Sequence, residues 1–404
     1  MRGRRLWRQT DIMNTSRSNT ALPIGLLAAA GFLSSAGARV IDPLLHVIAT
    51  DFATTVPIVA VVITAFTLPY GLNQLVLGPV GDKYGKLRVM LGALVAYAVA
   101  TASCALAGNL ASLTFLRAIA GASSAGLIPV GLAYIGDAVP YEQRQVTLSR
   151  FLTGVMVAQM VAGPVGGLFG DTIGWRGVFL VLAFGAMIVA GLLAWRIRGL
   201  PDRRSANATF NPRLYARLAR GAFSRPLLIG AMLDGMIMAG SFPFIAPYLH
   251  EGFGLSYQRV GLVLACFGLG ALVYTQLASR IIPRFGEPGM VTVGGLLMSA
   301  GLVVGMTAGS GLVFVLVELM LGLGFFMLHG VLQARATEML PDARATAVSS
   351  FACVLFIGQS LGAASMGVLI QLYGYQVAFL IDAAAIFVMA LWLRALLRNR
   401  VAQR

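Results

Sequence analysis

Long apolar runs recur along the whole of this chain, and they constrain its fold more than any other feature. A helix needs about twenty mostly apolar residues to cross a bilayer. Hydrophobic residues make up 58% of the 404 residues and charged residues only 11%, well below the share of about a quarter in soluble domains. The sequence therefore predicts an all-α membrane protein. Its twelve transmembrane helices are expected at residues 22–46, 57–79, 88–108, 110–136, 147–170, 176–195, 226–249, 258–279, 289–308, 311–336, 346–370 and 376–394.

The basic residues lie on one side of the predicted membrane. Every Lys and Arg falls in a tail or a loop of that side, except Arg39, Arg117, Arg176 and Arg259. Cytoplasmic loops carry such an excess of positive charge, so both termini are predicted to be cytoplasmic, in a plasma or inner membrane. The net charge of +15 is spread in short bursts between apolar runs, which argues against nucleic-acid binding.

The two halves of the chain repeat each other. The stretch DPLLH at 42–46 aligns with APYLH at 246–250, and KYG at 83–85 aligns with RFG at 284–286. Six spans thus occur twice in one orientation, and parallel repeats place a substrate site between them near mid-membrane. The expected parts are a tail (1–21), a six-helix bundle (22–195), a basic linker (196–225), a second six-helix bundle (226–395) and a final tail (396–404).

A glycine-rich motif, GPVGDKYGKLR, occupies residues 78–88 between the second and third spans. It resembles the signature Gly-x-x-x-Asp-(Arg/Lys)-x-Gly-(Arg/Lys) of the major facilitator superfamily. The matching residues are Gly78, Asp82, Lys83, Gly85 and Lys86. The resemblance implies two pseudo-symmetric six-helix bundles. It also implies a gating loop whose acid works against the eleventh span and against an acid that ends the fourth span, here Asp137. A static turn with solvated charges is the alternative.

Two further elements resemble motifs of the same superfamily. The stretch RAIAGASSAG at 117–126 is similar to an Arg-x-x-x-Gly element linked to proton coupling. The stretch AGPVGG at 162–167 is similar to the Gly-Pro-x-x-Gly-Gly element of its antiporters, with matches at Gly163, Pro164 and Gly167 and a mismatch at Leu168. The resemblance implies the twelve-span drug:proton antiporter branch. Pro164 also predicts a kink, and a purely structural kink is the alternative.

Ionisable residues inside apolar spans cost about 2.5–3.5 kcal/mol each at mid-membrane, so they are candidates for function. The set is Arg39, Asp42, Arg117, Asp234, Glu318, His329 and Asp382. We expect Asp42 to pair with Arg117, so that protonating the acid releases the arginine. Alternatively, Arg39 and Asp42 reach the membrane surface. For Asp234 the alternative is an ordinary interhelical hydrogen bond, and for Asp382 a structural role.

These features favour a proton-coupled exporter of small amphipathic molecules that works by alternating access. Asp42, Asp234 and Glu318 would supply the proton and substrate sites. The alternative is a symporter or exchanger of an anionic metabolite or sugar, with Arg39 and Arg117 as anchors. A sensor or scaffold that transports nothing is the third possibility.

No motif of an enzyme is present in the sequence. It lacks a Gly-x-x-x-x-Gly-Lys phosphate loop, a nucleophile motif and metal-spaced His or Cys residues, and its three cysteines lie far apart. We therefore expect a monomeric transporter that is not an enzyme. It would use no metal or cofactor and would be driven by the proton gradient.

Overall fold

The computed structural model describes residues 23–197 and 212–401, which are almost entirely helical and contain no strand. Nine of the helical segments in these ranges are long and apolar enough to cross a membrane. Three of the nine have 51 to 53 residues, about twice the length of a span, and each is bent once. When each of these three is counted as two spans, the structure has the twelve spans that the sequence predicts.

The first half contains six spans. Its elements are α1 (Ile24–Arg39), the 3-10 turn η1 (Asp42–Leu44), α2 (Leu45–Asp51), α3 (Val56–Val59), α4 (Val61–Tyr84), α5 (Lys86–Cys104), α6 (Leu110–Ser124), α7 (Leu127–Ala138) and α8 (Tyr141–Ile197). The second half repeats this plan. Its elements are α9 (Pro212–Arg220), α10 (Ser224–Asp234), the π-helix η2 (Gly235–Ala239), η3 (Phe242–Phe244), α11 (Ile245–Phe253), α12 (Tyr257–Thr307), α13 (Val313–Ala336), η4 (Pro341–Ala343) and α14 (Arg344–Val401).

Glycines with a positive φ angle turn the chain between successive spans. Gly174 in α8 and Gly374 in α14 have φ angles of 72° and 77°. Gly85 and Gly286 have φ angles of 100° and 60°. Only glycine adopts this region without strain from a Cβ atom. The two pairs stand at equivalent places of the repeat, so the aligned glycines of the sequence mark real turns of the backbone.

Spans one and seven are not regular helices. In each, a short 3-10 turn with proline near its start interrupts the span, with Pro43 in η1 and Pro243 in η3. Proline removes a backbone donor and clashes with the preceding turn, so it breaks a helix at this point. The π-helix η2 adds a second irregularity to span seven.

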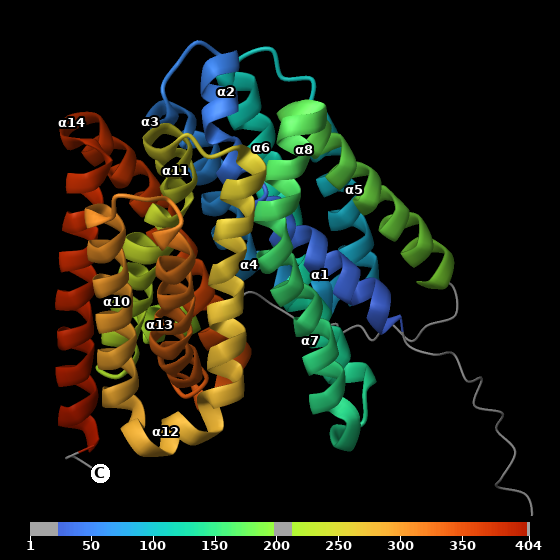
Figure 1. Cartoon of the computed structure of the whole chain (residues 1–404). Helices are drawn as coiled ribbons and strands as arrows, with labels where there is room; N and C mark the ends of the chain where they lie inside the picture. The colour runs from blue at the N-terminus through green and yellow to red at the C-terminus, as the bar shows by residue number, and fades with distance from the viewer. Residues whose placement is uncertain (1–22, 198–211, 402–404) are drawn as a thin grey trace, which may run out of the picture.

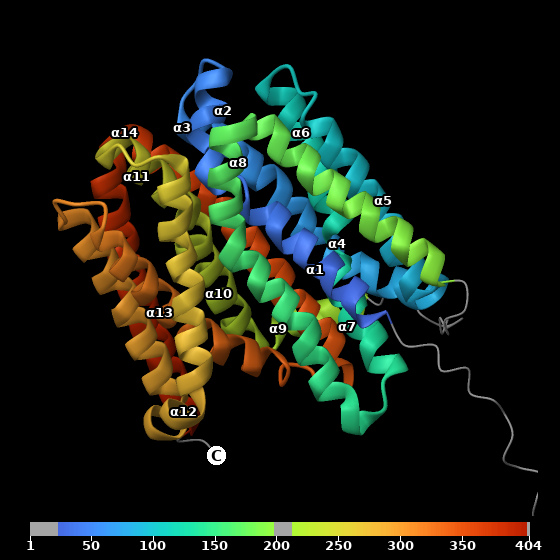
Figure 2. The same ribbon diagram turned by 45° about the vertical axis from the view of Figure 1, so that its right-hand side comes forward.

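The two halves pack against each other, as Figures 1 and 2 show. We call the side of the bundle with the Tyr84–Lys86 turn the Gly85 end, and the opposite side the His46 end. The halves meet along α4 and α14 and along α8 and α12, and α2 touches α11 at the His46 end. The ribbons of the two halves diverge toward the Gly85 end (Figure 1).

Hydrogen bonds connect the halves midway along α4 and α14. Thr64 donates to the carbonyl oxygen of Ser360 at 3.1 Å, and the hydroxyls of Thr67 and Ser360 are 2.8 Å apart. At the Gly85 end, helix α9 touches both halves. Tyr215 donates to the carbonyl oxygen of Leu75 at 3.4 Å, and Arg217 pairs with Asp342 at 2.7 Å. The Arg217 guanidinium lowers the pKa of Asp342 below its ordinary value.

Some expected boundaries differ from the structure or lie beyond it. Helix α14 continues to Val401, so the expected tail from residue 396 begins inside a helix. The helical segment Pro212–Arg220 occupies part of the expected linker. The expected tail 1–21, the linker residues 198–211 and the last residues 402–404 lie outside the described residues.

Candidate transport site

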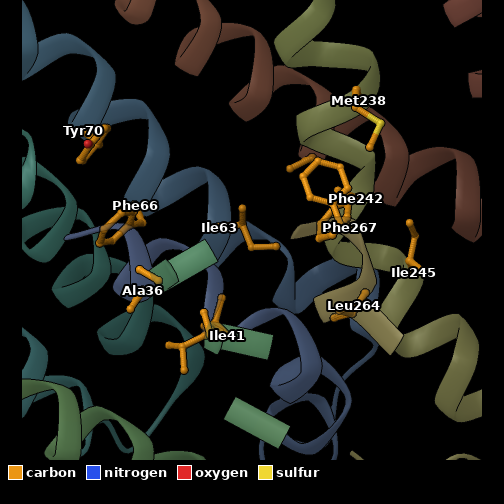
Figure 3. Close-up of a cluster of buried hydrophobic side chains, with 14 of the residues drawn as sticks. Ala36, Ile41, Ile63, Phe66, Tyr70, Met238, Phe242, Ile245, Leu264 and Phe267 are labelled. Atoms are coloured by element: carbon orange, nitrogen blue, oxygen red, sulfur yellow. The ribbon is translucent and has the colours of Figure 1, made fainter. Parts of the chain in front are cut away.

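An enclosed cavity lies between the two halves. Arg39, Asp42, Gln159 and Gly163 line it from the first half, and Phe242, Leu264 and Phe267 line it from the second. Figure 3 shows Phe242 and Phe267 next to each other on the side of the second half. The ring centroids of these two residues are 5.0 Å apart, in an edge-to-face arrangement. The cavity thus combines a cation, an acid, an amide and two aromatic rings.

Arg39 and Asp42 face each other at this cavity. The Arg39 Nη1 and the Asp42 Oδ2 are 3.6 Å apart, and the Arg39 guanidinium lies 4.8 Å from the centre of the Phe242 ring. Asp42 is only 2% exposed, and its Oδ1 has no hydrogen-bond partner among the described residues. These side chains line a cavity inside the protein, so the alternative in which they reach the membrane surface is not what the structure shows.

The expected ion pair between Asp42 and Arg117 is absent. Arg117 donates from Nη1 to the carbonyl oxygen of Gly37 at 3.0 Å, and its guanidinium lies 4.2 Å from the centre of the Phe66 ring. Helix α1 ends at Arg39, so carbonyl groups near its end, including that of Gly37, lack their usual helical donors. Arg117 supplies one of those donors. Its role in this conformation is to hold spans one, two and four together.

Glu318 occupies the position in the second half that Arg117 occupies in the first. One turn further on, a Cβ atom on Gly121 would overlap the Phe66 carbonyl oxygen, and one on Gly322 would overlap the Phe267 carbonyl oxygen. Glu318 is fully buried, and neither carboxylate oxygen has a hydrogen-bond partner among residues 23–197 and 212–401.

Asp234 and His329 form a buried pair between spans seven and ten. The Asp234 Oδ2 lies 2.7 Å from the His329 Nδ1, and Asp234 is 0% exposed. The His329 ring stacks on Phe325 with centroids 4.9 Å apart. Asp234 therefore makes an interhelical hydrogen bond in this structure. In span twelve, Asp382 accepts a hydrogen bond from Ser241 at 2.7 Å.

The gating motif forms a charge cluster at the Gly85 end. The Lys86 ammonium lies 2.5 Å from Asp82 and 2.7 Å from Asp137. Asp82 and Asp137 therefore share one basic partner, and the end of span two is joined to the end of span four. Lys83 extends over the Tyr84 ring at 5.2 Å, and a Cβ atom on Gly78 would meet nothing within 4 Å.

The antiporter-like motif lies where α8 and α12 approach most closely. A Cβ atom on Gly163 would stand 3.2 Å from the Gly261 carbonyl oxygen, and one on Gly167 would overlap the Tyr257 carbonyl oxygen. Small residues permit such close packing of helices in lipid. Pro164 lies inside α8 at this contact. The motif therefore belongs to the interface between the halves.

Polar contacts at the His46 end, which the sequence did not predict, also lie between the halves. His46 of α2 lies 3.0 Å from Glu251 of α11, and its ring centroid is 4.7 Å from that of His250. The Asp171 carboxylate accepts a hydrogen bond from the Gln258 backbone N–H at 3.0 Å. Both contacts join the halves. The histidine that the DPLLH and APYLH stretches share could have indicated this contact. A residue near a pseudo-twofold axis lies close to its counterpart in the other half.

The cavity residues Gln159, Phe242, Leu264 and Phe267 were also absent from the expected site. Apolar and amide side chains carry no charge signal within an apolar span, so only their position in the fold reveals them. No group of three or more His, Cys, Asp or Glu residues suited to a metal occurs in the part of the chain that the structure describes.

Twelve spans in two repeats, with charged and aromatic side chains enclosed between them, define a multi-pass membrane transporter. The sequence profile of the Major Facilitator Superfamily matches residues 27–334 and, in an overlapping match, 227–404. The chain belongs to this superfamily, and it is a transporter and not an enzyme.

Several relatives and solved structures are similar to this chain. A chloramphenicol resistance protein of Streptomyces lividans is 28% identical over 69% of this chain and 71% of its own length. An uncharacterised transporter of Bacillus subtilis is 26% identical over 82% of this chain and 85% of its own. A D-xylose-proton symporter superposes with a TM-score of 0.75 at 17% identity, covering 92% of this chain and 96% of that one. An inward-facing bacterial homologue of the lysosomal transporter Spinster gives 0.74 at 20% identity, covering 94% and 95%. The structural likenesses establish the fold.

Proposed function

We propose that this chain is a proton-coupled exporter of small amphipathic molecules that works by alternating access. The observation that carries the proposal is the composition of the enclosed cavity, in which two aromatic rings of the second half lie opposite one cation and one acid of the first. Such a site has no net charge of its own and suits neutral or weakly cationic aromatic compounds. The chloramphenicol resistance proteins among the relatives support this substrate class.

An orientation follows from the basic residues. Among the described loops, the Gly85 end carries every Lys and Arg residue except Arg176 and Arg259, so we assign it to the cytoplasm of a cell or inner membrane, with both termini there. The halves touch at the His46 end and diverge at the Gly85 end. In this orientation the cavity is closed to the outside, which corresponds to an inward-facing state. The similarity to an inward-facing Spinster homologue supports this assignment.

The competing function, uptake of an anionic metabolite or sugar, needs Arg39 and Arg117 as anchors. Asp42 already faces Arg39, and Arg117 is 2% exposed and bonded to the Gly37 carbonyl. The charge of Arg39 is therefore opposed by Asp42, and Arg117 does not line the cavity. We therefore place the exporter first, with the proton gradient as its energy source. It acts as a monomer, and Asp42, Asp234 and Glu318 are the acids that can carry the proton.

Reconstitution of the full chain into liposomes tests this function. With an imposed pH gradient, we expect chloramphenicol or tetraphenylphosphonium to cross the membrane in the direction opposite to the protons. Xylose and small carboxylates should not be transported. Asp42→Asn should reduce this exchange because it removes the acid of the cavity, whereas Asp342→Asn, at an exposed acid, should not. Carboxylate uptake together with protons would establish the competing function instead.

A further inference from the structure

The Asp234–His329 pair is separate from the enclosed cavity. Neither residue lines that cavity, and both lie in the second half, on α10 and α13. Asp234 is completely buried, and its Oδ1 has no hydrogen-bond partner among the described residues. The His329 side chain is 12% exposed. A buried carboxylate with one free oxygen is costly in a membrane unless it serves a function.

We propose that Asp234 and His329 together form the site that carries the coupling proton, and that substrate binds elsewhere, in the enclosed cavity. This inference rests on the proposed function and assigns its proton to one of three candidate acids. Coupling between the two sites would then be indirect and would pass through the structure of span seven.

The geometry specifies how the pair holds a proton. The Asp234 carboxylate lies at the His329 Nδ1 and favours the tautomer in which this nitrogen bears hydrogen. The lone pair of Nε2 then accepts a proton from a hydronium ion, which leaves as water, and the resulting imidazolium is balanced by the carboxylate. Loss of the same proton to water restores the neutral ring. No other bond forms or breaks.

A proton fits this site better than a metal cation. Hard cations require several oxygen ligands. The rings of Phe325 and Phe351 instead surround His329, with centroids 4.9 Å and 5.7 Å from its own. One carboxylate between aromatic rings provides too few oxygens for a sodium ion.

The helices that pack against the Asp234–His329 pair carry other titratable groups, which are bonded to different residues or lie further along the helix. Asp382 of α14 accepts from Ser241. Glu318 lies about three turns away along α13. Tyr274 of α12 lies next to Gly330, the residue after His329, and Cys353 lies on α14. Arg335 of α13 is bonded to Glu287 and Glu338.

A π-helix connects the proton site to the cavity. Asp234 is the last residue of α10, and η2 follows directly as Gly235–Ala239. The same span then reaches Phe242, whose ring lies against the Arg39 guanidinium in the cavity. Single π-turns inside helices are frequent at functional sites, because their extra residue allows a change of register. A change in the net charge of the Asp234–His329 pair therefore acts on the segment that orients Phe242.

The first experiment uses the full chain in liposomes loaded with a pH-sensitive dye, with chloramphenicol and tetraphenylphosphonium as probes. We expect Asp234→Asn and His329→Gln to lose substrate-driven proton flux by about tenfold or more, since removal of one positioned proton carrier typically costs that much. Exchange of labelled for unlabelled probe should persist in both variants. Asp382→Asn, a matched acid outside the pair, should keep its proton flux.

The outcomes separate the two proposals. If the unmodified protein exchanges both probes without moving protons, the proposed function fails and this inference fails with it. If the unmodified protein moves protons and the two variants move them equally well, only the inference is overturned. Loss of probe exchange together with proton flux would also overturn it, since it would place the pair in the substrate site.

Histidine-selective 15N NMR tests the pair without any substrate. The chain has three histidines, so His329→Gln identifies the signal of His329. We expect Asp234→Asn to shift the His329 nitrogen signals and to leave those of His46 and His250 unchanged, which also shows that the variant is folded. A His329 signal that is unaffected by Asp234→Asn would overturn the proposal.

Discussion

Arg117 and Glu318 occupy equivalent positions in the two halves but carry opposite charges. Arg117 is held by a backbone carbonyl and an aromatic ring, whereas both oxygens of Glu318 lack hydrogen-bond partners within the described residues. The repeat therefore conserves the glycine contact beside each residue and not the chemistry of the side chain. The two halves therefore differ in the charge at this position and share the glycine one turn further on.

The close contact between α8 and α12 depends on single glycines. A Cβ atom on Gly167 would overlap the Tyr257 carbonyl oxygen, so Gly167→Ala forces the two halves apart. Overpacking of this kind costs about 1–3 kcal/mol. We expect Gly167→Ala to lower the melting temperature in detergent and to reduce transport.

Gly191 of the same helix is the matched control. A Cβ atom there would meet nothing within 4 Å. Gly191→Ala should be neutral or more stable by about 0.5–1 kcal/mol, because alanine is the better helix former. Equal melting temperatures for the two variants would contradict a glycine-dependent contact.

At the scale of elements, the two halves build similar charge clusters at the Gly85 end with inverted signs. In the first half Lys86, at the start of α5, joins two acids, Asp82 and Asp137. In the second half Arg335 of α13 joins Glu287 and Glu338. Glu287 follows Gly286 as Lys86 follows Gly85. Each cluster fastens the turn after its second span to the end of its fourth span.

The Lys86 cluster can be tested with a neighbouring lysine as control. Lys86→Gln leaves two carboxylates facing each other without a cation. Each partly exposed ion pair contributes about 0.2–1 kcal/mol, so the two pairs together predict a loss of the order of 1 kcal/mol and slower transport. Lys83→Gln should change neither quantity, since Lys83 contacts only the Tyr84 ring in the described contacts. Thermal unfolding and initial transport rates measure both effects. A larger loss for Lys83→Gln would refute a fastening role for Lys86.

For the whole molecule, the arrangement of the halves predicts where movement occurs. Contacts at the His46 end, such as His46 with Glu251, must break if the cavity is to open there. We expect a short thiol-specific cross-linker between cysteines at positions 46 and 251 to stop transport, in a chain whose native cysteines are replaced by serine. Cleavage of the linker should restore the activity. Full transport by the cross-linked protein would show that this end stays closed throughout the cycle.

The sequence by itself determined the number of spans, the duplication, the turns at aligned glycines and the membership of a transporter superfamily. Each of these follows from local patterns: apolar length decides a span, and a glycine in the left-handed region decides a turn. The irregular backbone at Asp42 was also predictable, because Asp42 precedes Pro43 and helical geometry is disfavoured for the residue before a proline.

Only the tertiary structure decided which charged groups meet. Asp42 lies beside Arg39 and not Arg117, because the free carbonyl of Gly37 takes the Arg117 guanidinium. Asp234 pairs with His329, 95 residues away, and the aromatic wall of the cavity comes from two separate spans. Such pairings depend on the relative depth and rotation of packed helices. A hydrophobic pattern cannot encode these quantities, because lipid-facing and buried apolar residues look alike in sequence.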